Sequence, residues 1–276
     1  MNNSTLAFIG GGNMACALIN GLIEDGTAPQ DILVAEPDEQ RREQLAVQFG
    51  IRTVDDNTLA AREADILILA VKPQVLKEVA TAIAPALAQG TPLCLSIAAG
   101  IRHASLQRWL GKDVPLVRVM PNTPAMLGAG ASGLYAPESI SEAQRSTAEH
   151  IMRATGIAIW LNDEAQMDVL TAVSGSGPAY FFLFMEAMEN SARKLGLTEK
   201  TAHLLVLQTA LGAARMALES TTSLADLRKS VTSPGGTTEK AIGAFQEQGL
   251  EQLVDKALTA ARDRSVEMSA SLGEEE

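Results

Sequence analysis

The feature that most constrains this chain is a run of three glycines directly after a short apolar segment near its start. Leu6-Ala-Phe-Ile9 is followed by Gly10-Gly-Gly-Asn-Met-Ala15, which fits the pattern G-x-G-x-x-A. Between a strand and a helix, this pattern lets the chain turn tightly and lets a pyrophosphate approach the main chain. We therefore expect a dinucleotide-binding turn, in which backbone N–H groups from Gly10 to Ala15 face the cofactor.

The rest of the first half alternates between apolar runs and helical segments. The run Asp65-Ile-Leu-Ile-Leu-Ala-Val71 has no polar alternation, as expected of a strand buried on both faces of a sheet. The alternation predicts an α/β fold with a Rossmann-type, mostly parallel sheet and right-handed crossovers. Strands are expected at Thr5–Ile9, Ile32–Ala35, Asp65–Val71, Leu93–Ile97, Leu116–Val119 and Ile157–Leu161, and helices at Asn13–Glu24, Arg41–Phe49, Val75–Leu87 and Ser141–Thr155.

The pattern changes after Asn162, where the strands stop and helical periodicity takes over. The chain is therefore predicted to have a dinucleotide-binding Rossmann domain over residues 1–162 and an all-α domain over residues 163–276. Helices are expected at Asp163–Leu195 with an interruption at Gly175-Ser-Gly-Pro178, and then at Thr198–Ser220, Ser223–Lys229, Thr237–Gln248 and Leu250–Ser271.

A second group of small polar residues, Ser233-Pro-Gly-Gly-Thr-Thr238, stands at the start of one of these helices. If the N–H groups of Gly235, Gly236 and Thr237 are unpaired, the helix start could hold a carboxylate or phosphate without an arginine. A serine or threonine cap with flanking turn glycines explains the same residues without a ligand. Spacing alone leaves both interpretations open.

Composition narrows the classes of function. Lys and Arg number 22 against 33 Asp and Glu, and the net charge of −11 disfavours nucleic acid and anionic membranes as partners. Cys16 and Cys94 stand among apolar neighbours and are expected to be buried and reduced, and no Cys/His cluster suggests a metal. The first residues lack the features of a signal peptide, and no apolar stretch is long enough to span a membrane, so we expect a cytoplasmic protein.

Residues at the end of the second expected strand bear on the choice of dinucleotide. Glu36 is placed to accept a hydrogen bond from a ribose 2′-hydroxyl and to repel a 2′-phosphate. Arg41 and Arg42 follow one helical turn later and could contact a phosphate if Glu36 turns away. These residues favour NAD over NADP.

Six segments of the sequence form a recognisable set of motifs: Gly10-Gly-Gly-Asn-Met-Ala15, Ala70-Val-Lys-Pro73, Ser96-Ile-Ala-Ala-Gly100, Met120-Pro-Asn-Thr-Pro124, Ser174-Gly-Ser-Gly-Pro-Ala-Tyr180 and Val231-Thr-Ser-Pro-Gly-Gly-Thr-Thr238. With these motifs the chain resembles the pyrroline-5-carboxylate reductases, the enzymes of the last step of proline synthesis, over about residues 5–268. The resemblance implies hydride transfer from NADPH or NADH to 1-pyrroline-5-carboxylate, giving L-proline, without a metal. It also implies a homodimer intertwined through a helical substrate and dimerisation domain, often stacked into decamers, with active sites where a Rossmann domain meets helices of the dimer.

The resemblance also implies roles for individual residues. Family members commonly prefer NADPH and carry Ser or Asn and a basic residue after the second strand, whereas this chain has Glu36-Pro-Asp38 there. The substrate-binding residues would be Glu164, Ser233, Gly235, Gly236, Thr237 and Thr238, with Thr238 as the catalytic residue. The cofactor-binding residues would be Ile9, Gly10, Gly11, Gly12, Asn13, Met14, Asn57, Ala70, Val71, Lys72, Pro73, Ile97, Ala98, Ala99, Met120 and Asn122, to which the strand-end position adds Glu36.

The reaction suits a site without a strong acid, because a cyclic imine is basic enough to be protonated near neutral pH. We expect Thr238 to hydrogen-bond the ring nitrogen and the amides of Gly235 to Thr237 to hold the carboxylate. A β-hydroxyacid dehydrogenase would carry a catalytic lysine after the glycine-rich Gly175-Ser-Gly177, which is absent here. A reductase of a six-membered cyclic imino acid and a non-catalytic NAD(P)-binding regulator remain as alternatives.

Overall fold

A computed structural model describes residues 4–111 and 113–273, so the expectation about the first residues falls partly outside the described chain. The chain divides into two compact units. Unit 1 consists of residues 1–176 together with 261–276, and unit 2 consists of residues 177–260.

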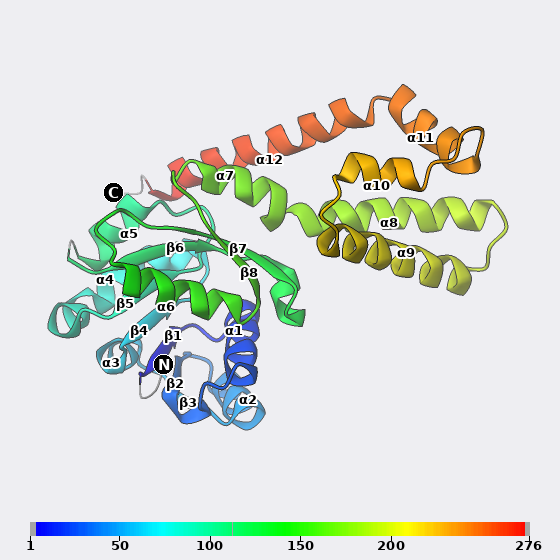
Figure 1. Cartoon of the computed structure of the whole chain (residues 1–276). Coiled ribbons are helices and arrows are strands. Elements are labelled where there is room, and N and C mark those ends of the chain that lie inside the picture. The colour runs from blue at the N-terminus through cyan, green and yellow to red at the C-terminus, as the bar shows by residue number, and fades with distance from the viewer. Residues whose placement is uncertain (1–3, 112, 274–276) are drawn as a thin grey trace. The chain divides into compact units, whose positions relative to one another are not determined.

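Unit 1 contains an eight-stranded sheet with the strand order β3-β2-β1-β4-β5-β6-β7-β8 (Figure 1). All neighbouring strands are parallel except β6 and β7, which confirms the mostly parallel Rossmann-type sheet. The strands are β1 (Leu6–Ile9), β2 (Ile32–Ala35), β3 (Arg52–Val54), β4 (Ile66–Leu69), β5 (Leu93–Ser96), β6 (Leu116–Met120), β7 (Gly130–Tyr135) and β8 (Gly156–Trp160).

Helices cover both faces of this sheet (Figure 1). Successive side chains of a strand point to opposite faces, so Phe8 packs in one core cluster and Ile9 in the other. Both faces are therefore apolar, which explains why the inner strands show no polar alternation. One face is covered by α1 (Asn13–Glu24), α2 (Glu39–Phe49) and α6 (Glu142–Arg153), and the other by α3 (Asn57–Glu63), α4 (Pro73–Gly90) and α5 (His103–Leu110).

The expected strands and helices of unit 1 are present, with shifts of a few residues at their ends. The sequence did not predict β3, β7, α3, α5 or the short helical turns η1 (Pro29–Asp31) and η2 (Thr123–Leu127). The long helix expected from Asp163 starts later, as α7 (Gln166–Leu170), and continues through a π-helical turn, η3 (Thr171–Gly175). The small residues after Val173 thus mark a change of helical geometry.

Unit 2 is helical throughout and contains α8 (Gly177–Lys194), α9 (Glu199–Glu219), α10 (Leu224–Ser230), α11 (Thr237–Glu247) and the first part of α12 (Leu250–Gly273). The Thr198 side chain caps α9 by accepting from the Thr201 N–H, as the sequence predicts. From residue 161 to residue 273 the described chain contains no strand, and the described helices include none long and apolar enough to cross a bilayer.

The domain boundary at Asn162 stays a prediction. Strands end at Trp160, but the compact unit extends to Ser176 and also includes α12 from Ala261 onward. The end of α12 is tied to unit 1 by a buried hydrogen bond of 2.7 Å, which the Ser265 hydroxyl donates to Asp168.

Candidate cofactor and substrate sites

The residues predicted to bind the cofactor lie at the ends of parallel strands of unit 1 or in the segments that follow them. Because β1 to β6 run parallel, their carboxyl ends meet at one edge of the sheet. The strand order reverses at β1, which lies between β2 and β4, and open α/β sheets bind ligands at such a point. The predicted residues at these strand ends and in the segments that follow are Ile9, Gly10, Gly11, Gly12, Asn13, Met14, Glu36, Asn57, Ala70, Val71, Lys72, Pro73, Ile97, Ala98, Ala99, Met120 and Asn122.

The glycine turn has the backbone that its sequence predicts. Gly10 has φ +97°, and a Cβ there would lie 2.9 Å from the Ala70 carbonyl oxygen, so only glycine fits. Gly12 is exposed, and a Cβ there would meet no atom within 4 Å. Gly12 is also the N-cap of α1 and carries no side-chain cap, which leaves an open helix start suited to a phosphate.

The expectation that N–H groups from Gly10 onward face a ligand is wrong for the first two. The Gly10 N–H donates to the Ala35 carbonyl at 2.8 Å, and the Gly11 N–H donates to Glu36 Oε2 at 2.9 Å. The N–H groups that the helix start can offer therefore begin at Gly12.

The segment after β2 folds back onto the glycine turn. Glu36 Oε1 also accepts from the Asp38 N–H at 3.2 Å, so both carboxylate oxygens have a partner. Arg41 Nε donates to the Gly11 carbonyl at 2.9 Å, and Arg42 Nη1 donates to the carbonyls of Glu36 and Pro37. Both arginines thus hold backbone groups of unit 1.

Glu164 lies in unit 1, in a charged cluster that the sequence did not reveal. Its Oε1 accepts from Arg118 Nη1 at 2.8 Å and from the His103 N–H at 2.6 Å. The Arg118 side chain is only 6% exposed and that of Glu164 24% exposed, so this is a largely buried ion pair. The signal was a charged residue inside the apolar strand Leu116-Val-Arg-Val-Met120.

A cavity of about 610 Å³ borders this ion pair. Burial lowers the pKa of the nearby His103 imidazole, whose Nε2 lies 3.2 Å from the Leu116 carbonyl. The cavity is lined by Arg102, Arg118, Asp163, Glu164, Ala165, Asp168, Val169, Arg262 and Val266. Three arginines and three carboxylates are among these residues, so the cavity suits a polar or zwitterionic group.

Met120 and Asn122 both contact the small-residue segment that begins at Ser174. Asn122 is buried, donates to the Ser174 carbonyl at 3.0 Å and accepts from the Ala131 N–H at 2.9 Å. A Cβ on Gly175 would lie 2.7 Å from Met120 Cε. Gly175 therefore leaves room for the Met120 side chain.

The predicted anion site of unit 2 differs from its expectation. Gly236 is the N-cap of α11, but the Gly235 N–H donates to Glu239 Oε2 at 2.8 Å and the Gly236 N–H donates to the Ser233 carbonyl at 3.0 Å. The expectation of three consecutive unpaired N–H groups is therefore wrong for both glycines. Glu239, three residues after the N-cap, has the spacing of a capping box, which was the missed signal.

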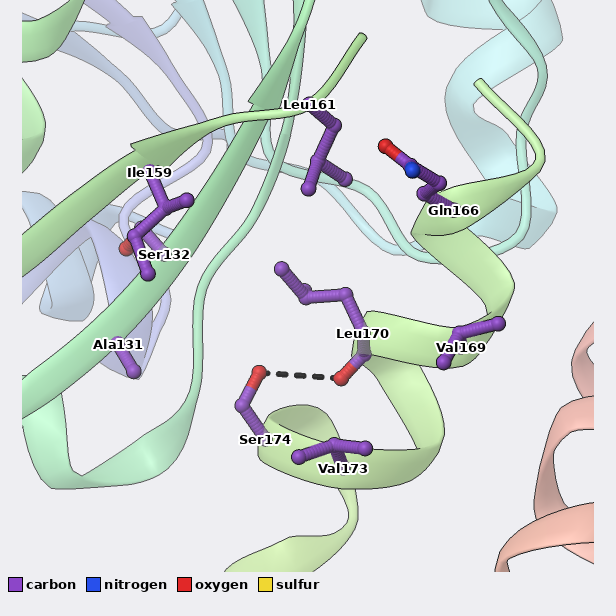
Figure 2. Close-up of a pocket in the computed structure, with 9 residues that line it drawn as sticks. All are labelled: Ala131, Ser132, Ile159, Leu161, Gln166, Val169, Leu170, Val173 and Ser174. Carbon is purple, nitrogen blue, oxygen red and sulfur yellow. Dashed lines mark hydrogen bonds between the residues drawn. The ribbon is translucent and has the colours of Figure 1, made fainter. Parts of the chain in front are cut away.

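An apolar pocket of about 620 Å³ is lined by residues of β7 and β8 and by the helical segment from Gln166 to Ser174 (Figure 2). Figure 2 shows the side chains of Leu161 and Leu170 pointing toward each other. Its lining residues are Ala131, Ser132, Ile159, Leu161, Gln166, Val169, Leu170, Val173 and Ser174, all of them in unit 1.

Neither a metal site nor a disulfide is found among residues 4–111 and 113–273. Both cysteines are free; Cys94 is buried as expected, whereas Cys16 is only half-buried, which corrects that expectation. Burial raises the pKa of both thiols, that of Cys94 to about 12, so both are protonated at neutral pH.

Two family models match the chain. The model described as pyrroline-5-carboxylate reductase dimerisation matches residues 164–268, and the model described as NADP oxidoreductase coenzyme F420-dependent matches residues 5–100. The first covers most of the helical region, and the second covers the glycine turn.

Relatives match over nearly the whole chain. The pyrroline-5-carboxylate reductase of Pseudomonas aeruginosa is 53% identical over 99% of this chain and 100% of its own length. The solved structure of the Coxiella burnetii reductase has a TM-score of 0.93 at 46% identity, covering 97% of this chain and 99% of that one. The Plasmodium falciparum reductase, solved with NADP bound, has a TM-score of 0.86 at 29% identity and covers 98% and 99% of the two chains. The chain therefore belongs to the pyrroline-5-carboxylate reductase family.

Proposed function

We infer that this chain is an oxidoreductase that reduces 1-pyrroline-5-carboxylate to L-proline with NADPH or NADH. The observation that carries this conclusion is membership of the reductase family over almost the entire chain. Both signature segments of the family, the glycine turn and Val231-Thr-Ser-Pro-Gly-Gly-Thr-Thr238, are intact in the sequence. When bound, the reduced nicotinamide supplies the hydride.

The residues of unit 1 fit a dinucleotide. Positive φ at Gly10, open space above Gly12 and an uncapped helix start are the features that a pyrophosphate requires. We propose that Gly12, Asn13 and Met14 donate their N–H groups to it, and that Asn57, Ala70–Pro73, Ile97–Ala99, Met120 and Asn122 line the remainder. Neutral or apolar residues dominate this last group, which suits a nicotinamide shielded from water.

For the substrate, the proposal rests on the start of α11. Thr237 and Thr238 occupy its first two positions after the Gly236 N-cap, where backbone N–H groups lack helical partners. We propose that these N–H groups hold the substrate carboxylate, with a gain of roughly 0.3–2 kcal/mol from the helix start. The Thr238 hydroxyl would accept a hydrogen bond from the protonated ring nitrogen. Glu164 of unit 1 stays a proposed substrate-binding residue on the resemblance alone.

This assignment is tested by Thr238→Ala, with Thr237→Ser as a control that keeps both hydroxyl groups. The alanine variant should lose turnover, with an unchanged Kd for the reduced dinucleotide. A steady-state rate equal to the parent's would remove Thr238 from the mechanism. Parallel assays with a six-membered cyclic imino acid test ring size, because faster turnover of that ring would favour the alternative substrate.

The family model supports an oligomer, and we propose that it is a homodimer, which in family members often stacks into decamers. Within the described residues of unit 2, only Ala202 and Val206 are buried apolar side chains. Phe181, Phe182 and Leu183 of α8 are between 64% and 69% exposed, which is unusual for a stable monomer. Sedimentation of the purified protein at several concentrations distinguishes dimer, decamer and monomer.

Two further expectations stay predictions from the sequence. The net charge of −11 disfavours nucleic acid and anionic membranes as partners, which a binding assay at low salt checks. A cytoplasmic location is checked by cell fractionation.

A further inference from the structure

One arginine, Arg41, donates a hydrogen bond to the backbone of the glycine turn in unit 1. Arg41 is half-buried on α2, and each of its three guanidinium nitrogens has a partner. Nε donates to the Gly11 carbonyl at 2.9 Å, Nη2 to Cys16 Sγ at 2.9 Å and Nη1 to Gln44 Oε1 at 3.4 Å. Gly11, Cys16 and Gln44 all belong to unit 1, so the contacts lie within one compact body.

We propose that Arg41 is a positioning residue for the cofactor pyrophosphate and that it does not read the 2′-phosphate. In a planar trans peptide, the C=O of one residue and the N–H of the next point in opposite directions. Arg41 holds the Gly11 C=O on the side of α2, so the Gly12 N–H points away from α2. Gly12 is exposed, and a Cβ added to it would meet no atom within 4 Å, so the space beside this residue is open to a ligand.

Glu36 completes the arrangement from the other side of Gly11. Its carboxylate accepts the Gly11 N–H, so both backbone polar groups of this glycine are fixed by side chains. A Cβ on Gly11 would lie 2.5 Å from Leu45 Cδ1, so the turn is also packed tightly against α2. The first free N–H of the turn is thereby oriented before any ligand arrives, which lowers the entropic cost of binding.

The same contacts argue against recognition of a 2′-phosphate by Arg41. A guanidinium recognises phosphate through a pair of parallel N–H donors. Each nitrogen of Arg41 already donates one N–H group to a different acceptor within unit 1, and these contacts hold the guanidinium against the glycine turn. The pyrophosphate is common to NADH and NADPH. Loss of Arg41 should therefore weaken both dinucleotides by the same factor.

Arg42 provides the matched control. It is the next residue on the same helix, it is also half-buried, and its guanidinium holds the carbonyls of Glu36 and Pro37 instead of Gly11. Arg41→Ala and Arg42→Ala remove the same charge from nearly the same place. A general electrostatic attraction would make their effects equal.

This inference rests on the proposed function only in that the protein must bind a nicotinamide dinucleotide. The test is therefore the Kd of NADH and of NADPH, measured with full-length protein by nucleotide fluorescence without the imine. Arg41→Ala should raise both Kd values about tenfold, the effect of losing one hydrogen bond to a charged group, and Arg42→Ala should raise the Kd of NADH less than about twofold. At saturating dinucleotide, kcat of Arg41→Ala should match the parent's.

Three results would overturn the inference. An increase in Kd confined to NADPH would show that Arg41 binds the 2′-phosphate. Equal increases in Kd in the Arg41 and Arg42 variants would show that Arg41 acts only through its charge. An unchanged Kd in Arg41→Ala would remove any role. If the alanine variant does not fold, Arg41→Lys, which keeps the charge but loses the fork of donors, must show the same equal weakening of both dinucleotides. A parent protein that reduces no imine but binds dinucleotide would defeat the proposed function alone.

Discussion

Replacing Glu164 with alanine should destabilise the protein through the arginine that it leaves behind. Arg118 lies in the middle of β6 with a side chain that is 6% exposed, and it forms an ion pair with Glu164 at 2.8 Å. Without that carboxylate, the positive charge of the guanidinium remains buried with no ion-pair partner to offset the cost of removing it from water. The His103 N–H loses its acceptor in the same variant.

The size of the effect follows from the burial of the two partners. Breaking a buried ion pair by removing one partner costs about 3–5 kcal/mol. Glu164 is 24% exposed, so water can reach part of the vacated space, and the lower end applies, about 3 kcal/mol. For a chain of this size, that loss corresponds to a Tm lower by roughly 6–12 °C.

Urea denaturation at one fixed protein concentration measures the loss, since oligomers gain stability with concentration. The control is Glu267→Ala, whose partner Arg264 and own side chain are 70% and 65% exposed, and whose loss should cost less than about 1 kcal/mol. Adding Arg118→Met to Glu164→Ala should recover at least half of the stability, because the buried guanidinium is then gone. If Glu164→Ala unfolds at the same urea concentration as Glu267→Ala, the reasoning about Arg118 is refuted.

Three other predictions follow from single contacts. The Gly12→Ala variant should fold with an unchanged Tm, since the added Cβ meets no atom within 4 Å. It should nevertheless bind the dinucleotide at least about tenfold more weakly in calorimetry, because the methyl group blocks the approach of the pyrophosphate. Normal binding would show that the phosphate does not approach Gly12. Glu36→Ser should shift the ratio of kcat/KM for NADPH over NADH upward, because the carboxylate that repels a 2′-phosphate is gone, and a constant ratio would exclude Glu36 as the discriminator. Burial lowers the pKa of His103 in the folded chain, so as the pH falls through 6.5 the unfolded chain takes up a proton before the folded chain does. The free energy of unfolding, measured by urea titration, should therefore decrease below that pH, and it should decrease less in His103→Gln.

The sequence predicted the parts of unit 1 that depend on local pattern. Buried parallel strands are short apolar runs, and the glycine turn is specified by its own backbone, so both could be located without tertiary information. β7, by contrast, reads Gly130-Ala-Ser-Gly-Leu-Tyr135, with two glycines that disfavour a strand. Glycine is needed at position 130 because of the tertiary structure: a Cβ there would lie 2.8 Å from the Thr155 carbonyl oxygen. No local sequence pattern reveals that contact.

The candidate sites were located as motifs, but their internal hydrogen bonds were not predicted. Glu36 and Glu239 each accept from a glycine N–H that the sequence alone had left for a ligand. Glu36 reaches the Gly11 N–H only through the tertiary fold, because the two residues lie 25 positions apart in the sequence. Glu239 lies only four positions after Gly235, so that contact is local and its spacing was visible in the sequence. Arg118 and Glu164 are far apart in the sequence, so their ion pair could be seen only once β6 and the segment before α7 were placed.

We infer that this chain makes L-proline from 1-pyrroline-5-carboxylate by oxidising a reduced nicotinamide dinucleotide. The most direct measurement incubates the purified protein with this imine and either NADH or NADPH, and then compares nucleotide oxidised with proline formed by chiral amino-acid analysis. We expect one L-proline for each nucleotide oxidised, and loss of both signals in Thr238→Ala. Oxidation without L-proline, or no oxidation of either nucleotide by folded parent protein, would contradict it.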